Sequence, residues 1–276
     1  KMVIDWFAIH DLATAMALFI SSWPMGIGLA LVTLPVLAET TGVRGAWGSV
    51  ALLALIAFAL FLVIYRTPPD AVPYGRISVV ELPWSPLILA AAIWGFYNAA
   101  LAMVFGFGPL VLVENGLSAG QASAATGLFM FVIVVAAPLG GRIADRTGRR
   151  DGLIVVTLVA GIVLLPLMLS VSQSTAWLVF GAAGFIVGLS PGAIVSMTSQ
   201  ILPPAARSFG TGIYYAIYYA VMMAAPPIAG RIADQTERVA SIFYLAIVFF
   251  CVCLVALGLF RRSMSKTGSR QSVTGS

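Results

Sequence analysis

This chain contains one short, strongly charged stretch, Gly141-Arg142-Ile143-Ala144-Asp145-Arg146-Thr147-Gly148-Arg149-Arg150, and its position constrains the fold. With Asp151 it places six charges in eleven positions, between apolar segments long enough to cross a bilayer. Charged side chains are costly inside hydrocarbon, so the sequence predicts a tight loop in the membrane interface that joins two hairpinned helices. Clustered arginines in a short loop indicate the cytoplasmic side.

The composition is that of a polytopic membrane protein. The 276 residues are 61% hydrophobic and 9% charged, whereas soluble domains carry about 25% charged residues. Mean hydropathy is +1.03. Segments of about 20 apolar residues that satisfy their own backbone groups predict an all-α membrane bundle. The net charge of +5 is not the footprint of a nucleic-acid partner, because the positive residues lie in short loops and in the tail.

Eight segments have the length and composition of a transmembrane helix. They cover approximately 12–37, 46–65, 87–113, 119–140, 153–171, 176–202, 209–230 and 240–260. The segment 176–202 carries Gly181, Gly184, Gly188 and Gly192 at spacings of three to four, which predicts a smooth face for close helix contact. The proline-rich stretch 66–86 predicts a linker between two packed units, and the polar tail 261–276 predicts disorder.

Charge distribution predicts the orientation of these helices. Eight crossings put both ends of the chain on one side, and placing the arginine stretch in the cytoplasm puts 12 Lys and Arg residues there against 3 outside. The sequence therefore predicts a multi-pass protein of the cell (inner) membrane with both ends cytoplasmic. Part of the arginine stretch recurs as Gly230-Arg231-Ile232-Ala233-Asp234 three crossings later, so the second copy is predicted on the opposite side.

Asp145 is an acid within an arginine cluster, and its partner stays open at this stage. Arg146 and Arg149 can neutralise it, or it can face the free N–H groups at the N-terminus of another helix. Gly141 and Gly148 permit close approach and positive φ. A solvated hairpin loop with one balancing acid is the alternative interpretation.

The pattern Gly-x-x-x-Asp-Arg-x-Gly-Arg-Arg resembles, over ten positions, the signature loop of the major facilitator superfamily of secondary transporters. In that family the loop follows the second helix of each six-helix half. There it forms a charge relay that holds the cytoplasmic helix ends together in one conformational state. The resemblance implies a gating role for Gly141, Asp145, Arg146, Gly148, Arg149 and Arg150.

The same resemblance gives a register for the whole chain. Six predicted helices follow the linker, as in a C-terminal half (87–260), and two precede it within 1–65. The chain thus resembles helices five to twelve of twelve, with the first four N-terminal helices as missing partners; a genuine eight-helix protein is the alternative. Asp145 would then approach the helix end near His10 to Thr14. The N-terminal residues and Ser22-Trp23-Pro24 also resemble cyanate- or nitrate-type bacterial permeases.

Candidate substrate residues are aromatic and amide side chains, because the predicted helix interiors contain no acid. Family sites lie at the bilayer midplane between the halves. Trp94 and Asn98 share a helix face at i,i+4, and the tyrosines of 209–230 form two i,i+4 pairs. The candidates are Trp23, Trp94, Tyr97, Asn98, Tyr214, Tyr215, Tyr218 and Tyr219, with core packing as the alternative role for each.

The function that the resemblance implies is secondary active transport of a small solute by alternating access, with proton or ion coupling. The sequence shows no metal cluster, nucleophile–base pair or phosphate loop, so we expect neither a cofactor nor an enzyme. Membrane lipid is an expected partner, because the loop arginines face the anionic inner leaflet. A receptor or assembly subunit on the same scaffold is the alternative, and solute uptake would discriminate between the two.

Overall fold

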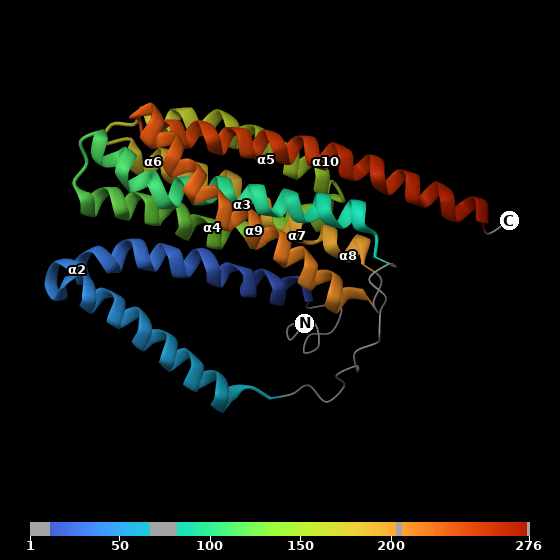
Figure 1. Cartoon of the computed structure of the whole chain (residues 1–276), viewed down its shortest axis with the longest axis horizontal. Coiled ribbons are helices and arrows are strands. Elements are labelled where there is room, and N and C mark those ends of the chain that lie inside the picture. The colour runs from blue at the N-terminus through green and yellow to red at the C-terminus, as the bar shows by residue number, and fades with distance from the viewer. Residues whose placement is uncertain (1–11, 67–81, 203–205, 275–276) are drawn as a thin grey trace.

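The computed structural model describes residues 12–66, 82–202 and 206–274, and these form an all-α bundle (Figure 1). The all-α membrane class predicted from the sequence is confirmed. In chain order the helices are α2 (Leu12–Ile64), α3 (Trp84–Glu114), α4 (Ala119–Thr147), α5 (Arg150–Leu169), α6 (Ala176–Gly188), α7 (Pro191–Val195), α8 (Met197–Ile201), α9 (Arg207–Thr236) and α10 (Ala240–Thr274).

Seven helical spans among the described residues are long and apolar enough to cross a membrane, against the eight that the sequence predicted. The difference arises in α2, which joins the first two predicted segments into one element. The chain reverses at Gly42 (φ 74°, ψ 170°), a backbone region that only glycine adopts readily. An inner arm (12–41) and an outer arm (43–64) therefore diverge from this residue, as the V-shaped blue ribbon of Figure 1 shows.

The core of the bundle lies around α3, which packs against α4, α9 and α10. Its fully buried side chains include Leu87, Ile93, Tyr97 and Leu112. This centre is apolar all round the helix, as expected of a span enclosed by other helices. The inner arm of α2 joins the bundle through α4: a Cβ added to Gly28 would lie 3.3 Å from the Gly127 carbonyl oxygen.

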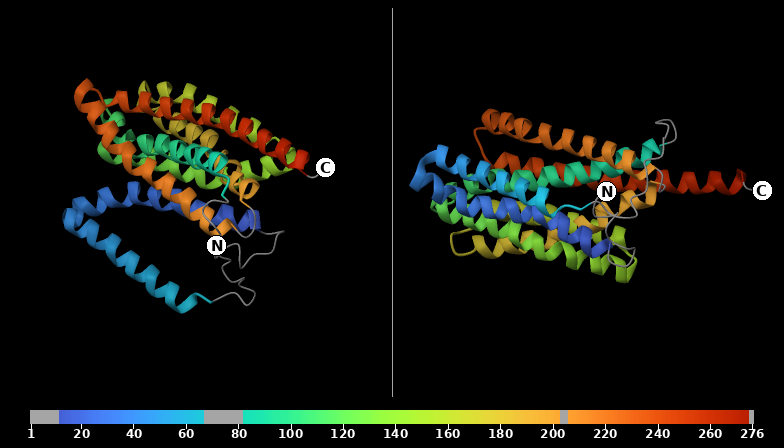
Figure 2. Two further views of the ribbon diagram at one scale, coloured as in Figure 1. Left: turned by 45° about the vertical axis from the view of Figure 1, so that its right-hand side comes forward. Right: turned by 90° about the horizontal axis from the view of Figure 1, so that it is seen from below.

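The outer arm of α2 is exposed over nearly all of its apolar residues. Leu53, Phe58, Leu62, Val63 and Ile64 are among its exposed side chains. In the left-hand view of Figure 2 the arm runs away from the other helices. In a bilayer, lipid tails or other helices would cover such an apolar surface.

The predicted glycine face of 176–202 is confirmed. A Cβ added to Gly184 would lie 2.3 Å from the carbonyl oxygen of Phe129 on α4, and one added to Gly188 would lie 2.9 Å from the Ala136 Cβ. The backbones of α4 and α6 are therefore in direct contact at these positions. Any residue larger than glycine there would hold the two helices apart.

Two predicted boundaries differ from the structure. The single helix expected over 176–202 is divided into α6, α7 and α8, with the first break just before Pro191, which cannot donate a helical hydrogen bond. The last helix was expected to end at 260 before a disordered tail, but α10 continues to Thr274. No proline interrupts that stretch, and Arg261 in it is held by an ion pair to Asp151.

The helices alternate in direction, so their ends gather at two faces of the bundle (Figure 1). We call the face that contains the α4–α5 connection the polar end, and the face that contains Gly42 the far end. Helices α3, α5 and α9 begin at the polar end, and α4, α8 and α10 lead to it. The second copy of the arginine stretch, at Gly230–Asp234 in α9, lies toward the far end, opposite the first copy as predicted.

Candidate functional site at the polar end

The arginine stretch is mostly helical, which corrects the expected ten-residue loop. Helix α4 continues to Thr147, and only Gly148 and Arg149 separate it from α5. Gly148 ends the helix in the left-handed conformation (φ 64°) and donates its N–H to the Ala144 carbonyl oxygen at 3.0 Å. The predicted positive φ is confirmed there. Gly141 is helical and instead allows close approach: a Cβ on Gly192 of α7 would lie 3.2 Å from the Gly141 Cα.

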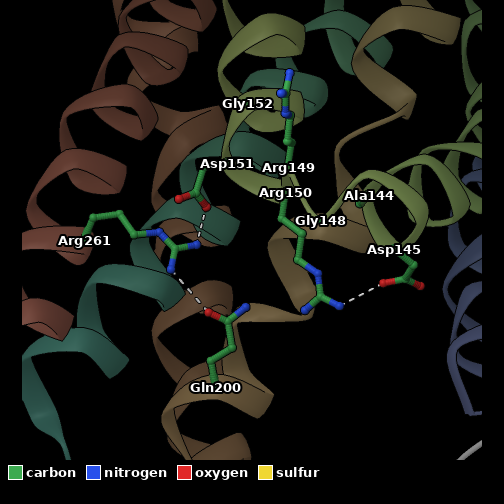
Figure 3. A pocket seen from close by; sticks show the side chains of 9 residues that line it. All are labelled: Ala144, Asp145, Gly148, Arg149, Arg150, Asp151, Gly152, Gln200 and Arg261. Carbon is green, nitrogen blue, oxygen red and sulfur yellow. Dashed lines mark hydrogen bonds and ion pairs between the residues drawn. The ribbon is translucent and has the colours of Figure 1, made fainter. Parts of the chain in front are cut away.

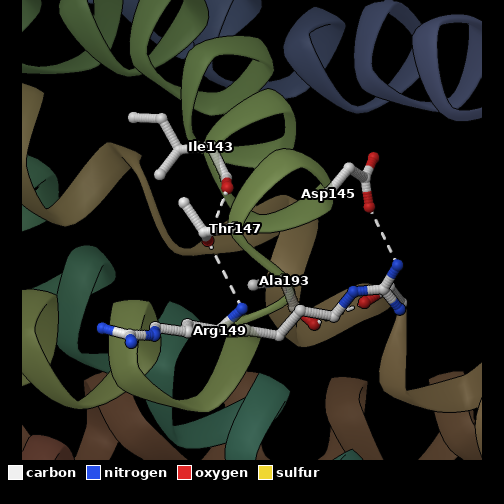
Figure 4. A network of polar contacts seen from close by, with 7 residues as sticks. Ile143, Asp145, Thr147, Arg149 and Ala193 are labelled. Atoms are coloured by element: carbon white, nitrogen blue, oxygen red, sulfur yellow. Dashed lines mark hydrogen bonds and ion pairs between the residues drawn. The ribbon is translucent and has the colours of Figure 1, made fainter.

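Asp145 forms an ion pair with Arg150 across this turn, with 2.8 Å between Oδ1 and Nη2. Beside it, Thr147 donates its hydroxyl to the Ile143 carbonyl oxygen at 2.8 Å and accepts the Arg149 N–H at 3.3 Å (Figure 4). Arg146 and Arg149, two of the partners left open by the sequence, make no ion pair within the described part of the chain, and Arg150 pairs with Asp145 instead. Because α4 continues past Asp145, Arg146 points about 100° away around the helix, whereas Arg150 begins the next helix.

The other predicted position of Asp145 was close to a helix end near His10 to Thr14. His10 lies outside the described residues, and α2 is described from Leu12 onward. That contact therefore stays a prediction.

A second polar network at the same end was not predicted. Asp151 of α5 pairs with Arg261 of α10, and Arg261 also donates from Nη1 to Gln200 Oε1 of α8 at 3.3 Å (Figure 3). The network ties the start of α5 and the end of α8 to α10. Sequence reasoning had assigned Arg261 to a disordered tail, and no local signal pairs residues 110 positions apart.

Between the two networks lies a pocket of about 620 Å³, open at the polar end (Figure 3). Three arginines and two aspartates line it, so the formal charge of its walls is +1. The lining residues are Ala144, Asp145, Gly148, Arg149, Arg150, Asp151, Gly152, Gln200 and Arg261. The pocket is therefore an open, charged recess where the end of α4, the start of α5 and the end of α8 meet α10 at Arg261.

The aromatic candidates gather where α3 meets α9. The Trp94 ring stacks on Tyr97 with centroids 5.8 Å apart and on Tyr218 with centroids 5.9 Å apart. Tyr215 contacts Tyr214 and Tyr218 edge to face. Tyr219 is 58% exposed and lies at the edge of this cluster, with its ring centroid 4.6 Å from that of Tyr218. Trp23 lies apart from it and packs against Phe105.

Two buried donors in the cluster have no hydrogen-bond partner among the described residues, the Trp94 Nε1 and the Tyr214 hydroxyl. Buried polar atoms nearly always have partners, so these two are available to an acceptor that the chain does not supply. Two other candidates bond within the bundle: the Tyr97 hydroxyl donates to the Val187 carbonyl oxygen at 2.8 Å, and the Asn98 Nδ2 donates to the Trp94 carbonyl oxygen at 2.8 Å. Asn98 is buried.

No group of three or more His, Cys, Asp or Glu side chains that could hold a metal ion occurs in the described ranges. The two cysteines are free, with Cys251 exposed and Cys253 buried.

Comparison with known proteins decides the family. The family model described as Major Facilitator Superfamily matches residues 95–275, which is well over half of the chain. The chain belongs to the major facilitator superfamily. The match begins within α3 and runs through the arginine stretch to the end of α10.

Two curated members of the superfamily are similar to this chain. The citrate-proton symporter of Klebsiella pneumoniae is 28% identical over 132 residues, which are 46% of this chain and 30% of that protein. The MFS transporter asaE of Aspergillus flavus is 27% identical over 198 residues, or 67% of this chain and 42% of that protein. The matched regions thus span less than half the length of either relative. The resemblance to cyanate- or nitrate-type permeases stays a prediction.

The superfamily fold is also found among solved structures. A bacterial homologue of the human lysosomal transporter Spinster, in an inward-facing and unoccupied conformation, aligns with 95% of this chain and 72% of its own chain. The TM-score is 0.58 and the sequence identity is 15%. The agreement concerns the fold.

Proposed function

We propose that this chain belongs to a secondary transporter that moves a small solute by alternating access. The observation that carries the proposal is the Asp145–Arg150 ion pair at the mouth of the polar-end pocket. Its side chains are 51% and 36% exposed, respectively. An exposed pair of this kind contributes about 0–1 kcal/mol, so it can break and re-form without unfolding the bundle. That reversibility is what a gating contact requires.

The proposed gate includes the rest of the arginine stretch. Arg146 and Arg149 have no ion-pair partner in the described part of the chain, so they are free to pair with an acid on another helix or with anionic lipid. We place the polar end in the cytoplasm, because clustered positive residues mark that side. By the helix ends on which they lie, the arginines at this end are Arg142, Arg146, Arg149, Arg150, Arg207, Arg261 and Arg262, whereas Arg44 follows the Gly42 bend and Arg231 and Arg238 flank the α9–α10 connection.

The proposed solute site is the aromatic cluster on α3 and α9. Trp94 and Tyr218 offer stacked rings, and the Trp94 Nε1 and Tyr214 hydroxyl offer donors without partners. A solute with acceptor oxygens, such as a small carboxylate, would satisfy both donors. The citrate-proton symporter among the relatives makes citrate the first solute to test. The acidic residues of the described helices lie at helix ends or at the α2 bend, and none lies at membrane depth. In this proposal, proton coupling therefore relies on groups outside the described helices.

Replacing Trp94 with phenylalanine is expected to raise the KM of uptake about tenfold while leaving membrane insertion unchanged. The substitution keeps an aromatic ring but removes the indole donor, and one hydrogen bond to a charged acceptor is worth about 1.5–3 kcal/mol. The measurement is the initial rate of uptake of labelled citrate and other small carboxylates into proteoliposomes with an imposed pH gradient.

Trp177→Phe is the matched control, because Trp177 begins α6 and is 40% exposed. Equal KM values for the two variants would show that Trp94 does not bind the solute. No uptake of any solute, together with a stable protein partner on purification, would instead favour a receptor or assembly subunit.

A further inference from the structure

At the break between α6 and α7, one backbone hydrogen-bond donor is absent, because residue 191 is a proline. In an uninterrupted helix the Val187 carbonyl would accept the N–H of residue 191, and Pro191 has no N–H. Two other donors take its place. The Ser190 N–H donates to the Val187 oxygen at 3.2 Å, and the Tyr97 hydroxyl on α3 donates to it at 2.8 Å. Tyr97 thus substitutes, from a neighbouring helix, for the bond that Pro191 removes.

A second side-chain bond holds the same break from the other side. The hydroxyls of Ser190 and Thr157 are hydrogen-bonded to each other, and both residues are buried. Thr157 is on α5 and also bonds to the Leu153 carbonyl oxygen of its own helix at 2.9 Å. The break is therefore tied to α3 by one hydroxyl and to α5 by another.

The segment beyond the break leads directly to the polar-end pocket. Residues 191–201 form the short helices α7 and α8, and Gln200 near their end accepts a hydrogen bond from Arg261. Along the way, Gly192 lies against Gly141 of the arginine stretch. A tilt of this segment at the break would therefore move one wall of the pocket relative to α4.

We propose that the α6–α7 break is a hinge and that the Tyr97 hydroxyl is the latch that holds it closed. In the latched state α7 lies against α4 and α8 against α3, as in this structure. When the Tyr97–Val187 bond opens, the segment 191–201 tilts away and the pocket deepens. Tyr97 is in this scheme a positioning residue, not a solute ligand, and its role does not depend on which solute is carried.

The test measures how often α8 opens to water. Met197 on α8 is 1% exposed, so a cysteine there is protected while the latch is closed. The full chain carrying Met197→Cys is reconstituted in liposomes and labelled with a membrane-impermeant maleimide, and the labelling of the parent chain corrects for Cys251 and Cys253. Tyr97→Phe is expected to raise the labelling rate about tenfold, which corresponds to about 1.4 kcal/mol in the opening equilibrium.

Thr126→Val is the matched control. It also removes a buried hydroxyl, but the Thr126 hydroxyl bonds only to the Ala122 carbonyl oxygen of its own helix, at 2.9 Å. We expect its labelling rate to stay within about twofold of the parent. A Tyr97→Phe rate equal to that of the parent, or equal to a raised Thr126→Val rate, would overturn the proposal.

A double substitution separates the latch from general loosening. Pro191→Ala restores an N–H that can donate to Val187, so the latch becomes redundant. In that background Tyr97→Phe is expected to change labelling by less than about twofold. A full tenfold increase there would mean that Tyr97 acts elsewhere, and would overturn the assignment. The comparison of Tyr97→Phe with Thr126→Val stands by itself if Pro191→Ala does not fold.

Discussion

Gly140→Ala is expected to destabilise the protein by about 3 kcal/mol or more, because overpacking two backbones in contact leaves no side chain to move aside. A Cβ on Gly140 of α4 would lie 1.9 Å from the carbonyl oxygen of Leu189, at the break between α6 and α7. The helices would have to separate, and the adjoining contacts of Gly184 and Gly188 would loosen with them. The measurement is the thermal midpoint of the detergent-purified protein, with the monodisperse fraction on size exclusion.

Gly258→Ala in α10 is the control, since no atom lies within 4 Å of the added Cβ and the residue is exposed. Alanine is a better helix former than glycine by about 1 kcal/mol, so this variant should be at least as stable as the parent. Similar midpoints for Gly140→Ala and Gly258→Ala would show that α4 and α6–α7 do not pack as closely as described.

Asp145→Asn is expected to reduce solute uptake roughly tenfold while leaving stability within about 1 kcal/mol of the parent. The substitution keeps the shape of the side chain and removes the charge that attracts Arg150. A half-exposed pair contributes little to folding, but a shift of about 1.4 kcal/mol between two transport states changes their ratio tenfold. The measurements are uptake in proteoliposomes and the thermal midpoint of the same preparation.

Asp234→Asn provides the matched control, because Asp234 occupies the equivalent place in the second copy of the sequence and has no ion pair among the described residues. It should leave uptake unchanged. Exchanging the charges, with Asp145→Arg and Arg150→Asp together, should recover part of the lost uptake. Equal uptake by Asp145→Asn and the parent would reduce Asp145 to an acid that balances nearby arginines.

Helix positions could be predicted well from the sequence because the bilayer fixes their length and character. The segment expected over 87–113 is α3 (Trp84–Glu114), and the glycine spacing of 176–202 predicted a close helix contact, which the structure shows with α4. The arginine stretch was predicted as a loop because charge cannot lie in hydrocarbon. A helix that continues beyond the membrane meets the same requirement, and Gly148 ends it only after Thr147.

The pairing of the polar residues could not be predicted, because it depends on how helix ends meet. Asp151 and Arg261 are 110 residues apart and face each other only when α5 and α10 are packed. Tyr97 was a candidate solute ligand because the predicted helix interiors contain no acid, which leaves aromatic and amide side chains as candidates. Its hydroxyl instead donates to the Val187 carbonyl oxygen on α6, next to the break between α6 and α7. This contact depends on how α3 packs against α6, which the sequence does not show.

The central claim is that the helix ends at the polar end exist in two arrangements and that Asp145 favours one of them. Spin labels at Val63 on the outer arm of α2 and at Ile143 on α4, both exposed, can measure this by pulsed electron paramagnetic resonance in liposomes. The account predicts two distance populations, and a shift toward the longer one in Asp145→Asn but not in Asp234→Asn. A single distance that is the same in all three proteins would contradict it.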